Sequence, residues 1–249
     1  MEAGGNQKAM PRGRIPTVTS SDIERDLDNP IWACLATRHA HIASGGPLVR
    51  RYPPVFSPIA GFASANPTRV AAIEALVEVG DDMGSFGPNV PSLSANWVSI
   101  RESVLEQMVR SDELLLQEGD VDAVTLGTAD IGEMLALVEL TQPGPFRQRT
   151  IELGTYIGIR EGGRLVAMAG QRMWVGDYRE VSAVCTHPDA QGRGYARALM
   201  GRVINGILRA GERPFLHVDR VNLRAIDTYR ALGFIRRTEL PLLHARRIG

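Results

Sequence analysis

The chain has 249 residues, of which 44% are hydrophobic, and its formal net charge is zero. This length is enough for one large or two small domains with a well-developed core. The zero net charge excludes a long-range attraction to nucleic acid, and no apolar run reaches the ~20 residues that span a bilayer. Neither nucleic acid nor a membrane is therefore expected as a partner.

The N-terminus and the cysteines indicate the compartment. Residues 1–16 lack the apolar segment of a signal peptide, and Cys34 and Cys185 are the only cysteines. Two cysteines offer no disulfide framework and suit a reducing environment. We therefore expect a cytoplasmic protein.

The chain is expected to comprise a tail and two further parts. Residues 1–20 mix Gly, Pro, Ser and Thr without periodicity, which predicts a flexible tail. Residues 21–118 are expected to form a smaller α/β N-terminal lobe. Residues 119–249 carry the motifs described below and are expected to form the functional domain.

Proline and asparagine mark the elements of the N-terminal lobe. Asn29-Pro30 and Asn66-Pro67 each predict the start of a helix, because asparagine caps helices and proline is favoured at their first position. Residues 48–60 predict extended chain interrupted by prolines, and residues 84–96 predict a loop. Residues 97–109 fit a helix and a strand equally well.

The C-terminal part alternates strands with helices. A strand at 123–126 is followed by a helical stripe that begins at Ile131, and Thr141-Gln-Pro-Gly-Pro-Phe146 predicts a loop. A hairpin is expected from 155–160 and 164–175, joined by the turn Glu161-Gly162-Gly163. A central strand then runs from Glu180 to Thr186.

Between this strand and an amphipathic helix lies Gln191-Gly-Arg-Gly-Tyr-Ala196. A turn that opens a helix presents unpaired N–H groups and the positive end of the helix dipole, and glycines let a phosphate approach the main chain. The P-loop pattern is excluded because no Gly-Lys-Ser/Thr occurs. A dinucleotide fingerprint is excluded because Arg197 stands where a small residue is needed.

A second motif follows after a short apolar strand at 214–218. The segment from Asn222 to Phe234 has the pattern Asn-x-x-Ala-x-x-x-Tyr-x-x-x-Gly-Phe. Together with the glycine stretch it resembles the GNAT superfamily of acyl-CoA N-acyltransferases, over roughly residues 121–247. Within that superfamily the chain looks closest to the glycine N-acyltransferase-like branch.

The resemblance implies an α+β GNAT fold, with a mixed, mostly antiparallel central sheet and helices on both faces. It also implies an N-acetyltransferase that uses acetyl-CoA as acyl donor, without a metal, and accepts a small-molecule amine or a protein amine. A homodimer is possible in such a protein. The residues it assigns to acetyl-CoA binding are Val184, Cys185, Thr186, Gln191, Gly192, Arg193, Gly194, Tyr195, Ala196, Asn222 and Tyr229.

Amide formation from a thioester needs a neutral amine and a proton for the departing thiolate. By resemblance Tyr229 is the acid that supplies the proton. The base is Glu180, whose pKa would be raised by half-burial, or His217, or water. Phe146 and His217 are expected on the acceptor side of the site.

Alternative chemistries and functions compete with this prediction. Cys185 lies mid-strand among apolar neighbours, where thiols are inert, so direct attack in a ternary complex is preferred to an acyl-cysteine. His39 and His41 lack a third ligand, so no metal site is expected. The competing functions are a non-catalytic acyl-CoA-binding regulatory module and a purely structural role. For the N-terminal lobe three roles stay open: a degenerate second acyltransferase-like half, a lid or an oligomer contact.

Overall fold

The computed structural model describes residues 25–249, so the predicted tail at residues 1–20 lies outside the described part. The helices are α2 (Pro30–Ala36), α3 (Arg69–Glu74), α4 (Ile131–Thr141), α5 (Tyr195–Arg209) and α6 (Leu223–Arg230). The strands are β1 (Ser44–Gly45), β2 (Val49–Arg51), β3 (Ala60–Phe62), β4 (Asp82–Phe86), β5 (Trp97–Arg110), β6 (Ala123–Thr125), β7 (Tyr156–Glu161), β8 (Arg164–Val175), β9 (Tyr178–Thr186), β10 (Arg213–Asp219) and β11 (Phe234–Arg247).

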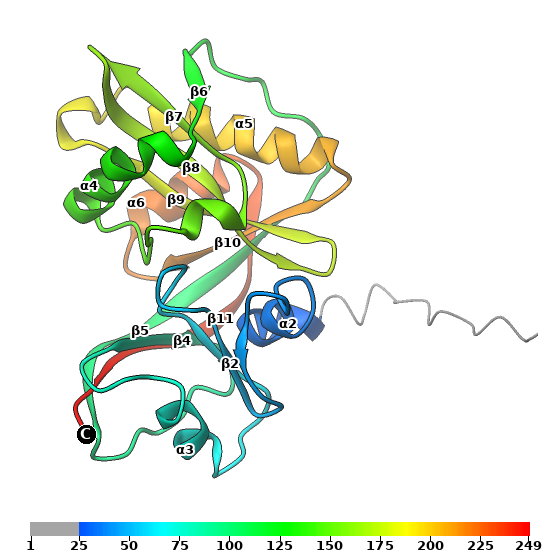
Figure 1. Cartoon of the computed structure of the whole chain (residues 1–249). Coiled ribbons are helices and arrows are strands. Elements are labelled where there is room, and N and C mark those ends of the chain that lie inside the picture. Colours follow the sequence, from blue (N-terminus) through cyan, green and yellow to red (C-terminus); the bar gives the residue numbers. More distant parts are fainter. Residues whose placement is uncertain (1–24) are drawn as a thin grey trace, which may run out of the picture.

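An eight-stranded sheet dominates the described part of the chain. Its strand order is β4-β11-β5-β10-β9-β8-β7-β6, and β1, β2 and β3 form a small separate sheet (Figure 1). Strands β9 and β10 run parallel, whereas the other neighbouring pairs of the large sheet are antiparallel. The expected mixed, mostly antiparallel sheet is confirmed.

Helices cover both faces of this sheet. Helices α4 and α5 both contact β8 and β9, but α5 packs with Ala167 of β8 and α4 packs with its neighbour Met168, so the two helices lie on opposite faces. Along β10, Leu216 packs with the core of α5 and α6, whereas Phe215 packs with the core of α2. Since neighbouring side chains of a strand point to opposite faces, α5 and α6 share one face and α2 and α4 the other. No helix of residues 25–249 combines the length and apolar character needed to cross a bilayer.

Two expectations for the N-terminal lobe are resolved by strand pairing. Residues 84–96 were expected to be a loop, but Asp82–Phe86 is strand β4, paired with β11. Its Gly-Ser composition resembles a loop, yet the segment is buried, and main-chain pairing decides its structure. Residues 97–109, which fitted a helix or a strand, form the long strand β5.

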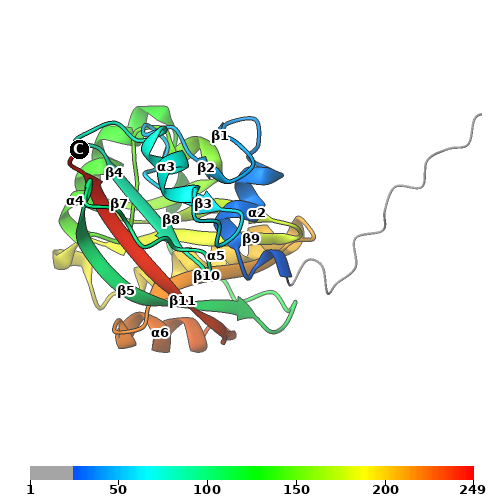
Figure 2. The ribbon, with the colours of Figure 1, turned by 90° about the horizontal axis from the view of Figure 1, so that it is seen from below.

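Strand β5 joins the two predicted parts of the chain. It precedes the boundary expected at residue 118, yet it lies between β10 and β11, which follow that boundary. Figure 2 shows β5 and β11 side by side across the sheet. The two parts therefore contribute strands to one sheet.

The connection from β5 to β6, residues 111–122, runs along helix α5. The side chain of Asn205, which is 1% exposed, accepts from Leu116 N at 2.8 Å and donates to Leu116 O at 2.9 Å. Arg202 donates to Val121 O at 2.6 Å further along. The buried side-chain amide of Asn205 thus makes the main-chain hydrogen bonds that a neighbouring strand would otherwise make with this segment.

Candidate active site

The glycine stretch forms the turn that the sequence predicts. Gly192 and Gly194 have φ values of 80° and 78°, a left-handed conformation that favours glycine. An added Cβ at either position would meet nothing within 4 Å. The space above both residues is therefore open to a ligand.

Helix α5 starts directly after this turn and points its free donors toward it. Its first internal hydrogen bond joins Ala198 N to Gly194 O at 3.0 Å. The N–H groups of Tyr195, Ala196 and Arg197 therefore precede the helical ladder and, with the helix dipole, favour an anion. Gln191, Gly192, Arg193 and Gly194 are exposed beside them.

Glu161, at the end of β7, holds the turn in place. Its Oε1 accepts from Arg193 Nη1 and from the Tyr195 hydroxyl, both at 2.6 Å. The hydrogen bond from Tyr195 and the pairing with Arg193 lower the pKa of Glu161. From the sequence, Glu161 is predictable only as part of a hairpin turn, because nothing local signals a partner about thirty residues away.

Strands β9 and β10 part beside this turn, leaving a fork in the middle of the sheet. Their parallel ladder ends at the pair Phe215 and Glu180, although β9 continues to Thr186 and β10 to Asp219. On its other side β10 pairs with β5 from Phe215 through Asp219. The edge of β9 beyond Glu180 consequently lacks β10 as a partner and is available to an extended ligand.

A β-bulge in β9 adds to this divergence. The register shifts between the pairs Gly170–Ser182 and Met168–Cys185, so β9 has one extra residue there. Ala183 within the bulge has φ 52°, a left-handed conformation that costs a non-glycine residue about 1–2 kcal/mol. Bulges bend strands and re-aim side chains, and strained backbone of this kind clusters at functional sites.

Helix α6 begins on the far side of the fork. The Asn222 side chain accepts from Ala225 N at 3.2 Å, as expected of its N-cap. Arg224 Nη1 lies 3.4 Å from Gln191 Oε1, so the starts of α5 and α6 are close to each other. The free main-chain N–H groups at the start of α5 and the exposed guanidinium of Arg224 thus lie close together beside the glycine turn.

Tyr229 lies on the inner side of α6. Its ring meets Phe234 edge-on at 6.3 Å between centroids, and burial raises its pKa to about 12. No described residue makes a hydrogen bond to its hydroxyl. The phenol is therefore protonated at neutral pH and free to donate to a ligand.

Glu180 differs from the expectation of a half-buried carboxylate with a raised pKa. It is 1% exposed and receives two hydrogen bonds of 2.9 Å from Arg172, a residue that sequence analysis missed. Burial alone would raise the pKa of Glu180, but Arg172 and His217 outweigh burial and lower the pKa to about 2. The pKa expectation was wrong because it left out the partner cation on β8.

The two residues expected on the acceptor side are both buried. The side chain of His217 is 4% exposed, and its Nδ1 lies 2.9 Å from Glu180 Oε1. Phe146 is 4% exposed and packs edge-on against Tyr156 beneath α4. Both lie on the face of the sheet opposite to α5 and α6.

Cys185 and His39 are also buried, whereas His41 is exposed. Burial raises the pKa of Cys185 to about 11, so its thiol stays protonated at neutral pH. His39 Nδ1 pairs with the Tyr52 hydroxyl at 2.7 Å and burial lowers its pKa to about 4. Within residues 25–249, no group of three His, Cys, Asp or Glu side chains is arranged to hold a metal ion.

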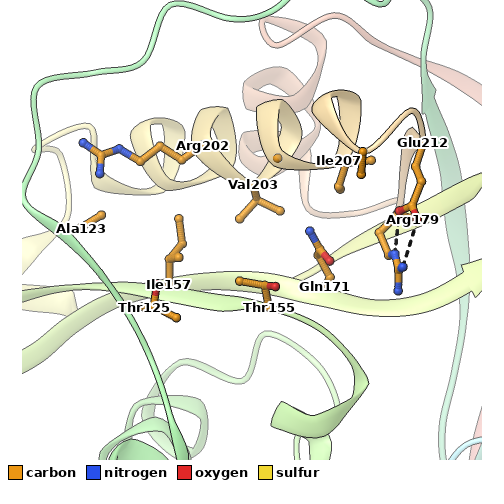
Figure 3. Close-up of a pocket in the computed structure, with 12 residues that line it drawn as sticks. Ala123, Thr125, Thr155, Ile157, Gln171, Arg179, Arg202, Val203, Ile207 and Glu212 are labelled. Carbon is orange, nitrogen blue, oxygen red and sulfur yellow. Dashed lines mark hydrogen bonds and ion pairs between the residues drawn. The ribbon is translucent and has the colours of Figure 1, made fainter.

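A separate cavity of about 410 Å³ lies between α5 and the strands β6 to β8 (Figure 3). Arg202 lines one end of it, and the ion pair of Arg179 with Glu212 lines the other. Its α5 residues begin at Arg202, which lies about 10 Å along the helix axis from Tyr195. This cavity is therefore distinct from the fork and the glycine turn.

Comparisons with known proteins agree with this fold. Residues 156–241 match the family described as FR47-like protein. A protein of the GNAT family from Novosphingobium aromaticivorans, described as a putative acetyltransferase, is 33% identical, with a TM-score of 0.81 over 89% of this chain and 98% of that chain. A search of the curated proteins finds no match.

More distant structures share the fold alone. A GCN5-related N-acetyltransferase from Kribbella flavida is 14% identical, with a TM-score of 0.61 over 90% of this chain and 96% of that chain. A GCN5-related N-acetyltransferase-like protein from Streptococcus suis is also 14% identical, with a TM-score of 0.56 over 93% and 94% of the two chains.

Proposed function

Because the chain belongs to the GNAT family of acetyltransferases, we propose that it transfers an acetyl group from acetyl-CoA to a primary amine by direct attack in a ternary complex. The observation that carries this proposal is the fork between β9 and β10, which opens beside the glycine turn. We further propose that the chain lies closest to the glycine N-acyltransferase-like branch and acts in the cytoplasm.

The donor would bind along the fork. In this proposal the diphosphate of coenzyme A lies on the main chain of residues 192–196, with Gln191 and Asn222 at its sides. The amide groups of the pantetheine arm pair with β9 at Val184, Cys185 and Thr186, as an added strand would. A main-chain N–H of that strand then polarises the thioester oxygen.

The acetyl group is transferred in one step. The amine nitrogen attacks the thioester carbon, the carbon–sulfur bond breaks, and the Tyr229 hydroxyl gives its proton to the departing sulfur. The nitrogen loses a proton as it becomes an amide, and that proton, carried by water, restores the Tyr229 phenol. The raised pKa of Tyr229 keeps that proton in place at neutral pH. The buried, protonated thiol of Cys185 supports direct attack over an acyl-cysteine route.

This function is tested by a screen that measures CoA release from acetyl-CoA in the presence of small amines, amino acids and peptides with a free N-terminus. With the best acceptor, Tyr229→Phe is expected to lower kcat by about a hundredfold, the scale of losing a general acid. It should leave the melting temperature and the affinity for acetyl-CoA unchanged, because no described residue bonds to this hydroxyl. Unaltered turnover in the variant would remove Tyr229 from the mechanism.

The same screen separates the alternative function. Binding of acetyl-CoA without CoA release from any amine would favour a non-catalytic acyl-CoA-binding module. Absence of CoA binding would contradict both functions.

A further inference from the structure

A buried polar network lies at the point where β9 and β10 part. Glu180 is the last residue of β9 that pairs with β10, and its carboxylate lies on the face of α2 and α4. Arg172 on β8 and His217 on β10 both reach this carboxylate. Three neighbouring strands are thus joined through one side chain at the base of the fork.

The Glu180 carboxylate has no acceptor capacity left. Oε1 receives Arg172 Nη2 and His217 Nδ1, each at 2.9 Å. Oε2 receives Arg172 Nε at 2.9 Å and Met173 N at 3.3 Å. A carboxylate offers about four lone-pair sites, and four donors occupy them here.

The protonation of His217 follows from its second neighbour, Gln107 on β5. Gln107 Oε1 accepts from Arg237 Nη1 at 2.9 Å, so its amide nitrogen faces the other way. That nitrogen donates to Leu27 O at 2.8 Å and lies 3.1 Å from His217 Nε2, which must then be an acceptor. His217 is therefore neutral, with its proton on Nδ1 and directed at Glu180.

Neither group has a free lone pair for an amine. To take a proton, Glu180 would have to give up a hydrogen bond from Arg172, a cation that is 7% exposed. Breaking a buried ion pair is strongly destabilising, because it leaves an uncompensated charge in the interior. A geometric role therefore fits these contacts better than proton abstraction.

We propose that Arg172, Glu180 and His217 are positioning residues that fix where β9 and β10 part, and so place the edge of β9 for the arm of the acyl donor. This inference rests on the proposed function, because it assigns the donor to the fork. It also removes Glu180 and His217 from the candidates for the base. The proton of the amine then passes to water or leaves before binding.

The test is to replace the whole ion pair. Arg172→Met combined with Glu180→Met removes both charges, and such replacements are often tolerated where removal of one partner is not. The matched control is Arg179→Met with Glu212→Met, a bidentate pair of 2.9 and 3.1 Å. Arg179 lies on β9 and Glu212 directly precedes β10, at the end where these two strands are paired. Both variants are compared with the wild type by calorimetric titration of CoA.

The Kd for CoA is expected to rise about tenfold in the Arg172/Glu180 variant and less than about twofold in the control. At saturating acetyl-CoA, the turnover of the Arg172/Glu180 variant should fall less than about threefold. This should hold both for the best amine of the screen and for hydroxylamine, which is uncharged at neutral pH. Equal CoA affinity in the two variants would refute the positioning role. A drop of about a hundredfold or more with the amine, but not with hydroxylamine, would instead identify a base.

His217→Ala provides a second variant that leaves the buried charges paired. It should raise the Kd for CoA and leave turnover at saturation near that of the wild type. Unchanged affinity would again refute the inference. Failure of the wild type itself to bind CoA would contradict the proposed function instead, so the two failures are distinguishable.

Discussion

The glycine turn gives the sharpest test of where the donor binds. Gly194 has φ 78° and nothing within 4 Å of an added Cβ, so Gly194→Ala introduces no clash within the protein. The substitution should therefore lower the free energy of unfolding only by the strain of a left-handed backbone at alanine, about 1–2 kcal/mol. For a protein of this size each kcal/mol lowers the melting temperature by about 2–4 °C.

The added methyl group would, however, occupy the proposed path of the diphosphate. A hydrogen bond between a main-chain N–H and a charged group contributes about 1.5–3 kcal/mol, so losing one should weaken CoA binding by about ten- to a hundredfold. Scanning fluorimetry gives the stability, and calorimetric titration gives the affinity.

Gly211 supplies a matched control at the other end of the same helix. It has φ 75° and equally open space around its Cβ. Gly211→Ala should therefore cost the same stability and leave CoA affinity unchanged. If both variants bound CoA as tightly as the wild type, the diphosphate would not lie on this turn.

Three further predictions follow from buried polar groups. The pKa of Glu180 is lowered to about 2 from an ordinary 4.5, which corresponds to about 3 kcal/mol of folded-state stability. This contribution is complete above pH 4.5 and is lost as the pH falls toward 2. Urea unfolding at several pH values measures it. Asn205→Leu should cost about 1–3 kcal/mol by urea unfolding, because it leaves the half-buried N–H and C=O groups of Leu116 without their partner, and no measurable loss would contradict the pairing. Thr150 Oγ1 donates to Phe56 O at 2.5 Å and accepts from Arg147 N at 2.7 Å, so it holds the end of the loop that carries Phe146. Because Phe146 is expected on the acceptor side, Thr150→Val should raise the KM for the amine more than that for acetyl-CoA, whereas equal shifts would separate this loop from the acceptor side.

The two motifs were predictable because their determinants are local. A cap such as Asn222 acts on residues three positions away, and the helical spacing of apolar residues fixes α5 and α6 without knowledge of the rest of the fold. Likewise, the glycines of the turn need positive φ for reasons contained within the turn itself.

The properties of Glu180 were not predictable because they depend on strand register. Arg172 is eight residues away in sequence, and only the hairpin of β8 and β9, with its irregular pairing, brings it to the carboxylate. Desolvation and a cationic partner shift a carboxyl pKa in opposite directions. Without the register, the sign of the pKa shift stays undetermined.

The role of the N-terminal lobe depends on a pairing that spans more than a hundred residues. Strand β5 binds β10 along Phe215 to Asp219, while β9 holds β10 through only three residue pairs. At the tip, the Asp219 carboxylate accepts from Ser103 Oγ at 2.6 Å and is paired with Arg101. One wall of the fork is thus set by a strand from the N-terminal half, and a change in that half that moves β5 would move β10 with it. Whatever else the lobe does, the width of the proposed donor site depends on it.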